Sequence, residues 1–215
     1  MFDPVIWKKL RRGPQVILLK DAAMISALTG LQSGDRVIDC GAGSGFLACY
    51  LGSIVAPAGK VFSYEKREEF QQLAAKNVEK ARLSDVVEIK LKDVLAEGFE
   101  ETDIDLITLD MGDSHLGLPH AFAALKAGGF CAGYLPHAEQ VQTFVKAALV
   151  AGFEQGETIE VIVRPMLVRE RGFRPENSGL LHTAYLSFLR KPKAGHKAAA
   201  NAMPPSSAPQ NTKVT

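Results

Sequence analysis

The chain has 215 residues, of which 47% are hydrophobic and 23% are charged, the balance of a globular protein with one well-filled domain. No stretch approaches the ~20 apolar residues that cross a bilayer, and the first residues lack the apolar core of a signal peptide. The composition therefore argues against a helical membrane protein and against a secreted one.

The cysteines and histidines show no metal-binding or disulfide pattern. Cys40, Cys49 and Cys131 lie far apart without C-x-x-C spacing, which predicts reduced core residues in a cytoplasmic protein. The five histidines show no metal-ligand spacing either. We expect no metal site.

Charge is distributed unevenly. Residues 1–20 and 160–193 each carry a net charge of +4, and residues 194–215 add +2. Because the whole chain carries +1, residues 21–159 hold −9. Basic ends around an acidic middle indicate that the ends contact a polyanion, although solvated surface lysines would give the same pattern.

The middle of the chain alternates strand and helix patterns. Strands are predicted over residues 36–39, 60–64, 86–91, 104–109 and 129–134, and helices over residues 45–55, 67–81 and 138–151. The inward face of the second helix is formed at helical spacing by Phe70, Leu73, Ala74, Asn77 and Ala81. This alternation predicts an α/β fold, with a doubly wound, mostly parallel sheet and helices on both faces.

The pattern changes after Gly152. Two β-rich runs, residues 158–163 and 183–188, are joined by a basic segment over 164–178 with no helix between them, which predicts a terminal antiparallel hairpin. From residue 192 onward Ala, Pro, Ser and Lys dominate, which predicts a disordered tail. We therefore divide the chain into a short basic N-terminal segment (1–20), one α/β domain (21–191) and a tail (192–215).

A glycine-rich loop, D-x-G-x-G-x-G over residues 39–45, follows the first strand. Its glycines permit positive φ and close approach of a ligand to the backbone, and the helix that starts near Gly45 offers unpaired N–H groups. A dinucleotide site uses a similar loop. The tighter glycine spacing and the carboxylate of Asp39 suit a cationic ligand better, such as the sulfonium and amino group of S-adenosylmethionine.

Carboxylates also follow the next three strands. Glu65 could accept both ribose hydroxyls of such a ligand, although an NAD site places an acid there too. Asp93 could accept from an adenine amino group, and Asp110 lies beside the crevice where open α/β sheets bind ligands. Any one of them alone is more often a helix cap or turn residue, whereas four at successive strand ends predict a binding site.

Three motifs lie outside the glycine loop: QVILLKD from Gln15 to Asp21, YLP with EQV from Tyr134 to Val141, and RP followed by HTAYL from Arg174 to Leu186. With these motifs, residues 13–191 resemble the tRNA adenine-N1 methyltransferases, which modify an adenine in the T-loop. The first motif matches the segment that enters that family's catalytic domain. The other two resemble its Y-x-P-x-x-E-Q-V signature and its terminal R-P…H-T-G-Y-L strand.

The resemblance implies a class I, Rossmann-like methyltransferase domain with a seven-stranded sheet and S-adenosylmethionine as cofactor. Asp110 matches the family's catalytic aspartate. A carboxylate that accepts from the exocyclic amine of adenine would raise electron density at N1 and stabilise the developing cation. The implied cofactor-binding residues are Gln15, Asp39, Gly41, Gly43, Ser44, Gly45, Phe46, Leu47, Glu65, Asp93 and Asp110.

The implied partner is tRNA, whose target base must be extracted into a pocket. The candidate phosphate contacts are Arg11, Arg12, Arg169, Arg171 and Arg174. Relatives assemble as tetramers, so a homotetramer is implied. The family's N-terminal β-rich domain is expected to be largely absent, and the sequence after Asp110 lacks the proline that relatives carry there.

Two alternatives stay open. A methyltransferase acting on a small molecule or a protein, such as a corrin-ring or isoaspartyl type, would share the glycine loop and Glu65 but not the HTAYL ending. A tRNA-binding subunit without catalytic activity would have little use for acids at four strand ends.

Overall fold

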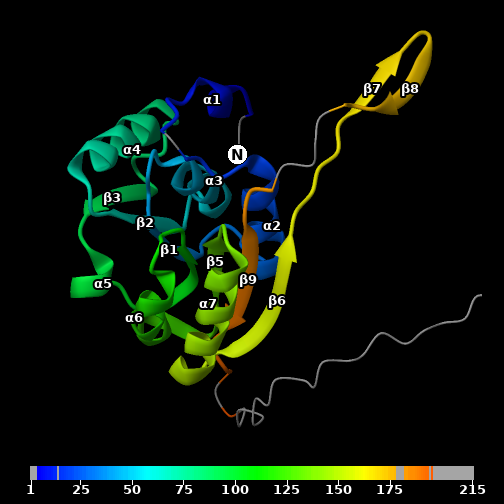
Figure 1. The fold of residues 1–215 in the computed structure, drawn as a ribbon. Coiled ribbons are helices and arrows are strands. Elements are labelled where there is room, and N and C mark those ends of the chain that lie inside the picture. The colour runs from blue at the N-terminus through cyan, green and yellow to red at the C-terminus, as the bar shows by residue number, and fades with distance from the viewer. Residues whose placement is uncertain (1–3, 14, 178–181, 194, 196–215) are drawn as a thin grey trace, which may run out of the picture.

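The structure, a computed structural model, describes residues 4–13, 15–177, 182–193 and 195 (Figure 1). Its centre is a seven-stranded sheet in the order β3-β2-β1-β4-β5-β9-β6. Strands β1 to β5 are parallel, and β9 runs antiparallel to both of its neighbours, β5 and β6. The predicted α/β class and mostly parallel seven-stranded sheet are confirmed.

The strands of this sheet are β1 (Arg36–Cys40), β2 (Lys60–Glu65), β3 (Val87–Leu91), β4 (Ile104–Leu109), β5 (Leu125–Leu135), β6 (Glu154–Glu160) and β9 (Tyr185–Arg190). The helices are α1 (Pro4–Lys9), α2 (Leu19–Thr29), α3 (Phe46–Val55), α4 (Glu68–Lys80), α5 (Val94–Glu97), α6 (Leu118–Ala124) and α7 (Ala138–Ala151). A 3-10 turn, η1 (Ser114–Gly117), precedes α6.

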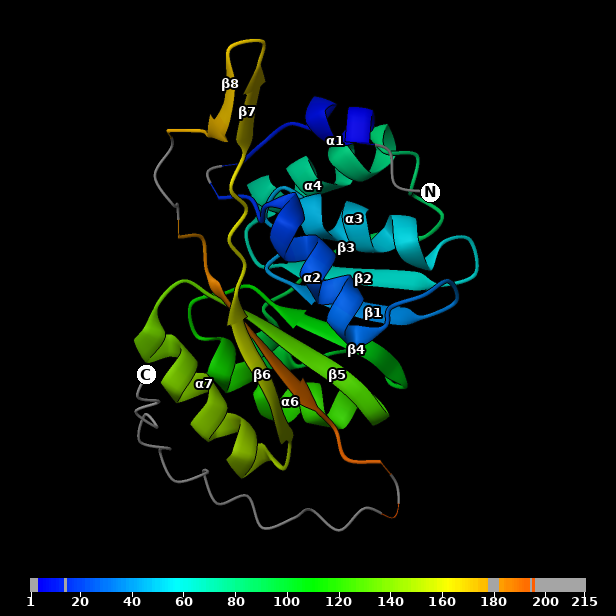
Figure 2. The ribbon, with the colours of Figure 1, turned by 90° about the vertical axis from the view of Figure 1, so that its right-hand side faces the viewer.

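Helices cover both faces of the sheet (Figure 2). On one face α2, α3 and α4 enclose a core that includes Ile25, Leu51 and Val78. On the other face α5, α6 and α7 enclose a second core, in which Leu118 and Phe144 are fully buried. Burial on both faces explains why apolar residues predominate in the central strands.

Most element boundaries agree with the sequence patterns, and the helix predicted over residues 138–151 is confirmed. Strand β5 begins earlier than expected because Leu125 already pairs with Ile104, before a register irregularity. The predicted boundary between the basic segment and the domain, at residue 21, falls inside α2. Ile17 is buried in the core, so the domain begins before that boundary.

The expected antiparallel pair is present as β6 and β9, but it is not a simple hairpin. The joining segment forms a separate two-stranded sheet of β7 (Met166–Arg169) and β8 (Gly172–Pro175), which stands away from the body (Figures 1 and 2). Strand β6 also ends at Glu160, and the side chains of Ile162 and Val163, which we expected in the strand, are exposed.

Three further expectations concern membrane-spanning helices, the cysteines and the C-terminal tail. In the described part of the chain no helix combines the length and apolar character needed to cross a membrane. Cys40, Cys49 and Cys131 are buried free thiols, as expected. The predicted tail lies outside the described residues, except for 192, 193 and 195.

Candidate active site

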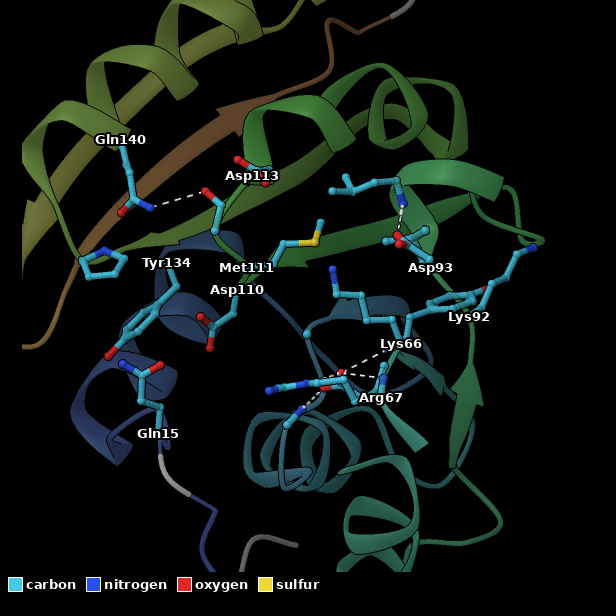
Figure 3. Close-up of a pocket in the computed structure, with 18 residues that line it drawn as sticks. Gln15, Lys66, Arg67, Lys92, Asp93, Asp110, Met111, Asp113, Tyr134 and Gln140 are labelled. Carbon is cyan, nitrogen blue, oxygen red and sulfur yellow. Dashed lines mark hydrogen bonds and ion pairs between the residues drawn. The ribbon is translucent and has the colours of Figure 1, made fainter. Parts of the chain in front are cut away.

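A cavity of about 430 Å³ opens where the carboxyl ends of β1 to β4 meet (Figure 3). Open parallel sheets bind ligands at this edge. It is lined by Gln15, Gly41, Gly43, Tyr64, Glu65, Lys66, Arg67, Lys92, Asp93, Val94, Leu95, Asp110, Met111, Gly112, Asp113, Tyr134, Pro136 and Gln140.

The glycine loop needs glycine at position 41 for two reasons. Gly41 has a φ of +86°, and a Cβ there would lie 2.1 Å from the carbonyl oxygen of Asp110. The backbone N–H of Asp110 also donates to the carbonyl oxygen of Cys40, at 2.9 Å. The loop after β1 and the end of β4 are therefore in direct backbone contact, which brings Asp110 to the glycine loop.

Glu65 joins the end of β2 to the same loop. Its Oε2 accepts from the backbone N–H of Gly43 at 3.0 Å, and its Oε1 accepts from the backbone N–H groups of Lys66 and Arg67, each at 3.1 Å. A carboxylate offers about four lone-pair sites. Oε2 of Glu65 therefore keeps acceptor capacity toward the cavity, where a ribose hydroxyl could donate.

Asp93 lies at the opposite end of the cavity from Asp110 (Figure 3). It caps α5, and its Oδ1 accepts from the backbone N–H of Leu95 at 3.1 Å. The cap fixes the orientation of the carboxylate and leaves Oδ2 as an acceptor that an adenine amino group could reach.

Asp110 is half-buried beside Tyr134 and Gln15 (Figure 3). Burial, with a smaller contribution from the charge of Asp39, raises the pKa of Asp110 to about 7. A carboxyl group that titrates near neutral pH and faces a cavity is suited to accept a hydrogen bond or a proton from a bound base.

Asp39 has a different environment from the one its sequence position suggested. It is buried, and its two oxygens accept from the hydroxyls of Ser63, at 2.7 Å, and Thr108, at 2.8 Å. Both partners lie opposite it on the neighbouring strands. Burial raises the pKa of Asp39, and these hydrogen bonds oppose that rise. Its carboxylate therefore joins β1 to β2 and β4 behind the cavity lining rather than facing a cationic ligand.

The structure brings six predicted cofactor residues to the cavity: Gln15, Gly41, Gly43, Glu65, Asp93 and Asp110. The other five, Asp39, Ser44, Gly45, Phe46 and Leu47, do not line it in the described structure. Phe46 and Leu47 turn their side chains into the core because α3 begins at Phe46. The part of the loop that faces the cavity is its glycine backbone.

Sequence reasoning missed several lining residues. Lys66 and Arg67 directly follow Glu65, and Lys66 extends into the cavity (Figure 3). Gln140 was noted only as part of a motif, and its Nε2 donates to the carbonyl oxygen of Gly112 at 3.3 Å. That bond joins α7 to the segment after Asp110, a role that strand-end patterns do not reveal.

The residues at the cavity fit S-adenosylmethionine. The backbone of Gly41 and Gly43 lines the cavity, and Glu65, Asp93 and Asp110 surround the space with acceptors. These groups suit a ligand that bears a sulfonium, an ammonium, two ribose hydroxyls and an adenine amino group. Within the described residues, no group of three potential metal ligands occurs.

The arginines predicted to contact RNA are exposed and line no part of the cavity. Arg169 and Arg174 lie on the β7–β8 sheet, and Arg171 lies in its turn. Arg174 donates to the side-chain oxygen of Asn177, so part of its guanidinium is already engaged. Arg11 and Arg12 follow α1, which lies at the same end of the molecule as β7–β8 (Figures 1 and 2).

Comparison with solved structures places the fold among methyltransferases. A crystal structure of a SAM-dependent O-methyltransferase from Thermotoga maritima superposes with a TM-score of 0.84 and 36% identity over 90% of this chain and 74% of that one. The tRNA (m1A58) methyltransferase TrmI of Aquifex aeolicus superposes with a TM-score of 0.78 and 30% identity, over 87% of this chain and 75% of that one.

Sequence comparison leads to the same group. The tRNA (adenine(57)-N(1)/adenine(58)-N(1))-methyltransferase TrmI of Methanocaldococcus jannaschii is 33% identical over 89% of this chain and 76% of its own length. The profile of the family described as tRNA methyltransferase complex GCD14 subunit matches residues 2–205. This chain therefore belongs to that tRNA methyltransferase family and has its class I, S-adenosylmethionine-dependent methyltransferase fold.

Proposed function

We propose that this protein transfers a methyl group from S-adenosylmethionine to N1 of an adenine in the T-loop of tRNA, at position 58 and in some substrates at position 57. The observation that carries the proposal is the placement of Asp110, a carboxylate with a pKa near 7, in a cavity that it shares with the glycine loop, Glu65 and Asp93. The family membership supports tRNA as the substrate.

In this proposal the bound cofactor supplies an electrophilic methyl group. Glu65 would accept from the ribose hydroxyls, Asp93 would accept from the cofactor's adenine amino group, and the backbone at Gly41 and Gly43 would pack against the methionine part. Together these residues would keep the methyl donor within reach of Asp110, and proximity would supply much of the rate enhancement.

Asp110 acts on the target base. Its carboxylate accepts a hydrogen bond from the exocyclic amine of the adenine, which orients N1 and raises its electron density. As N1 gains the methyl group, positive charge develops on the ring, and the carboxylate stabilises that charge and can take the amine proton. Tyr134 lies beside Asp110 and offers an apolar ring against which an extracted base can stack.

The exposed arginines are the proposed phosphate contacts. Arg169 and Arg171 on the β7–β8 sheet, with Arg11 and Arg12 after α1, form two basic regions at one end of the molecule. Such regions neutralise phosphates and release counterions, which supplies much of the affinity for a nucleic acid. A tRNA that bridges them would cover the end of the molecule above the cavity.

The proposed assembly is a homotetramer formed through β7–β8. This small sheet exposes large apolar side chains, with Val168 78% and Phe173 67% accessible, and among the described residues no other strand pairs with its outer edges. Sedimentation equilibrium would give four times the chain mass, and Val168→Lys with Phe173→Lys would give a smaller species.

The proposed location is the cytoplasm. A tRNA substrate and three free buried thiols fit a cytoplasmic location.

Methyl transfer into defined acceptors tests the function. Unmodified tRNA transcripts are incubated with the protein and labelled cofactor, then digested to nucleosides for mass spectrometry. We expect 1-methyladenosine, and its loss when positions 57 and 58 are changed to guanine. Labelling of a small molecule or protein, with none in tRNA, would refute the proposal.

We include small-molecule acceptors because the similar protein from Thermotoga maritima is described as a SAM-dependent O-methyltransferase. A hydroxyl acceptor would need a base but no exocyclic amine to recognise. Asp110 can serve either reaction, so a panel of phenolic and catechol acceptors run beside tRNA separates them. Calorimetric titration with the cofactor tests the alternative that this protein is a tRNA-binding subunit without activity. Such a subunit would give no heat of cofactor binding.

A further inference from the structure

Asn77 is a buried polar side chain on α4 that the reaction described above does not use. It is 2% exposed, and its amide makes three hydrogen bonds. Its Oδ1 accepts from the backbone N–H of Arg11 at 2.9 Å, and its Nδ2 donates to the carbonyl oxygens of Arg11 and Ser44, each at 2.8 Å. One amide thus joins the N-terminal segment to the glycine loop.

The segment held by Asn77 contacts the site at Gly13 and Gln15. We call residues 11–13 and 15–17 the strap. A Cβ at Gly13 would lie 3.4 Å from the Cβ of Ser44, so the strap backbone packs on the glycine loop there. Gln15 then lines the cavity, and Ile17 is buried in the core. The strap therefore contributes Gln15 to the wall of the cavity.

The strap is anchored on its other side as well. Leu10 is buried, and the Trp7 ring of α1 packs edge-on against Phe46, the first residue of α3, with ring centroids 4.8 Å apart. Nζ of Lys80 donates to the carbonyl oxygen of Lys9. These contacts tie α1 and Leu10, which lead directly into the strap, to α3 and α4, the two helices that flank the glycine loop.

We infer that the strap completes the cofactor site and that Asn77 is the positioning residue that holds it there. Glu65 holds the glycine loop from the cavity side through the N–H of Gly43, and Asn77 holds it from behind through the carbonyl of Ser44. Loss of the Asn77 bonds removes a hydrogen-bonded anchor from the strap and from one side of the loop together. The inference rests on the proposed cofactor but not on the proposed acceptor.

The strap also carries Arg11 and Arg12, whose side chains are exposed. A phosphate bound by these arginines favours the docked position of the strap, and the docked strap favours the cofactor. Coupling between two binding sites is reciprocal, so RNA and cofactor strengthen each other's binding by the same factor.

Calorimetric titration of the full chain with S-adenosylhomocysteine, without RNA, tests the positioning role. Arg11→Pro removes the backbone N–H that donates to Asn77, whereas Arg11→Ala keeps that N–H and removes only the guanidinium; circular dichroism and thermal unfolding check that both variants fold. We expect about tenfold weaker binding in Arg11→Pro, the effect of one or two lost hydrogen bonds, and unchanged binding in Arg11→Ala.

Asn77→Ala should weaken binding at least as much, and Gln72→Ala, an exposed residue of the same helix, should not. Trypsin gives a readout independent of affinity. We expect bound S-adenosylhomocysteine, the product formed from the cofactor, to slow cleavage after Arg11 and Arg12 in the wild type but not in Asn77→Ala. If Asn77→Ala unfolds, the comparison of Arg11→Pro with Arg11→Ala still tests the positioning role of Asn77.

Equal affinity and equal trypsin protection in wild type, Arg11→Pro and Asn77→Ala would overturn the positioning role while leaving the methyltransferase function intact. If the wild type does not bind the product at all, the proposed function fails with it. The coupling is tested by adding unmodified tRNA. We expect the product to bind at least about threefold more tightly in the wild type, and this gain to vanish in Arg11→Ala with Arg12→Ala. No gain in the wild type overturns the coupling.

Discussion

The charge state of Asp110 connects the stability of the protein to its activity. Its pKa lies at about 7 instead of 3.8, because burial disfavours the ionised carboxylate. This difference corresponds to about 4 kcal/mol in the folded state, and water in the open cavity reduces the measurable value to between about 1 and 4 kcal/mol. Asp110→Asn keeps the shape of the side chain and removes its ionisation.

The sign follows from the direction of the shift. The folded pKa is raised, so the favourable contribution of Asp110 is fully present below pH 3.8 and is lost as the pH rises through about 7. The asparagine variant avoids this loss. Its free energy of unfolding should match that of the wild type near pH 4 and exceed it by about 1 to 4 kcal/mol at pH 8.

Activity should change in the opposite direction. An amide cannot take the amine proton or stabilise the cation as a carboxylate does, so we expect turnover to fall by a factor of about 10² to 10⁴ with little change in cofactor affinity. In the wild type, kcat/KM should rise with pH to a plateau. The midpoint should lie at or below pH 7, because a bound sulfonium favours the carboxylate.

Urea unfolding between pH 4 and pH 8, together with labelled-methyl transfer, measures both effects. Asp85→Asn, an exposed aspartate, is the control and should change neither quantity. Full turnover in Asp110→Asn would remove this residue from the mechanism. If Asp110→Asn loses turnover but is no more stable than the wild type at pH 8, burial does not disfavour the ionised form of the Asp110 carboxylate.

Two further changes probe the loop and the basic sheet. Gly41→Ala should prevent cofactor binding and strongly lower the midpoint of thermal unfolding, because its Cβ would meet the carbonyl oxygen of Asp110. The control is Gly30→Ala, at a φ of +68° in open space, which should lower the free energy of unfolding by only about 1 to 2 kcal/mol. Equal effects of the two variants would contradict the close contact between Gly41 and Asp110. Arg169→Ala with Arg171→Ala should weaken tRNA binding and lower the salt dependence of log K by about 2, as filter binding at several salt concentrations would show. An unchanged slope of log K against log salt concentration would show that these two arginines do not contact the tRNA phosphates.

The sequence was most informative where local pattern and chemistry coincide. Strand-end acids identified Glu65, Asp93 and Asp110, because parallel strands bring their carboxyl ends to one edge whatever the rest of the fold does. The same reasoning misplaced Asp39. Its position before the loop is the same as that of a ligand-facing acid, and only the sheet register shows that Ser63 and Thr108 lie opposite it.

Contacts between distant segments could not be read from pattern. The pairing of Asn77 with Arg11, 66 residues away, depends on how α4 packs against the strap, and Asn77 appeared in the sequence only as one member of an inward helix face. The β7–β8 sheet was missed because its strands have four residues each and are largely exposed, so they show no apolar alternation.

The central claim is that the cavity at the strand ends presents the methyl donor to Asp110. A crystal structure with S-adenosylhomocysteine tests it most directly. We predict ribose hydroxyls on Glu65, the adenine amino group at Asp93, and the sulfur at the Asp110 end with space for a base beside Tyr134. A cofactor bound in the reverse direction, or outside this cavity, would contradict it.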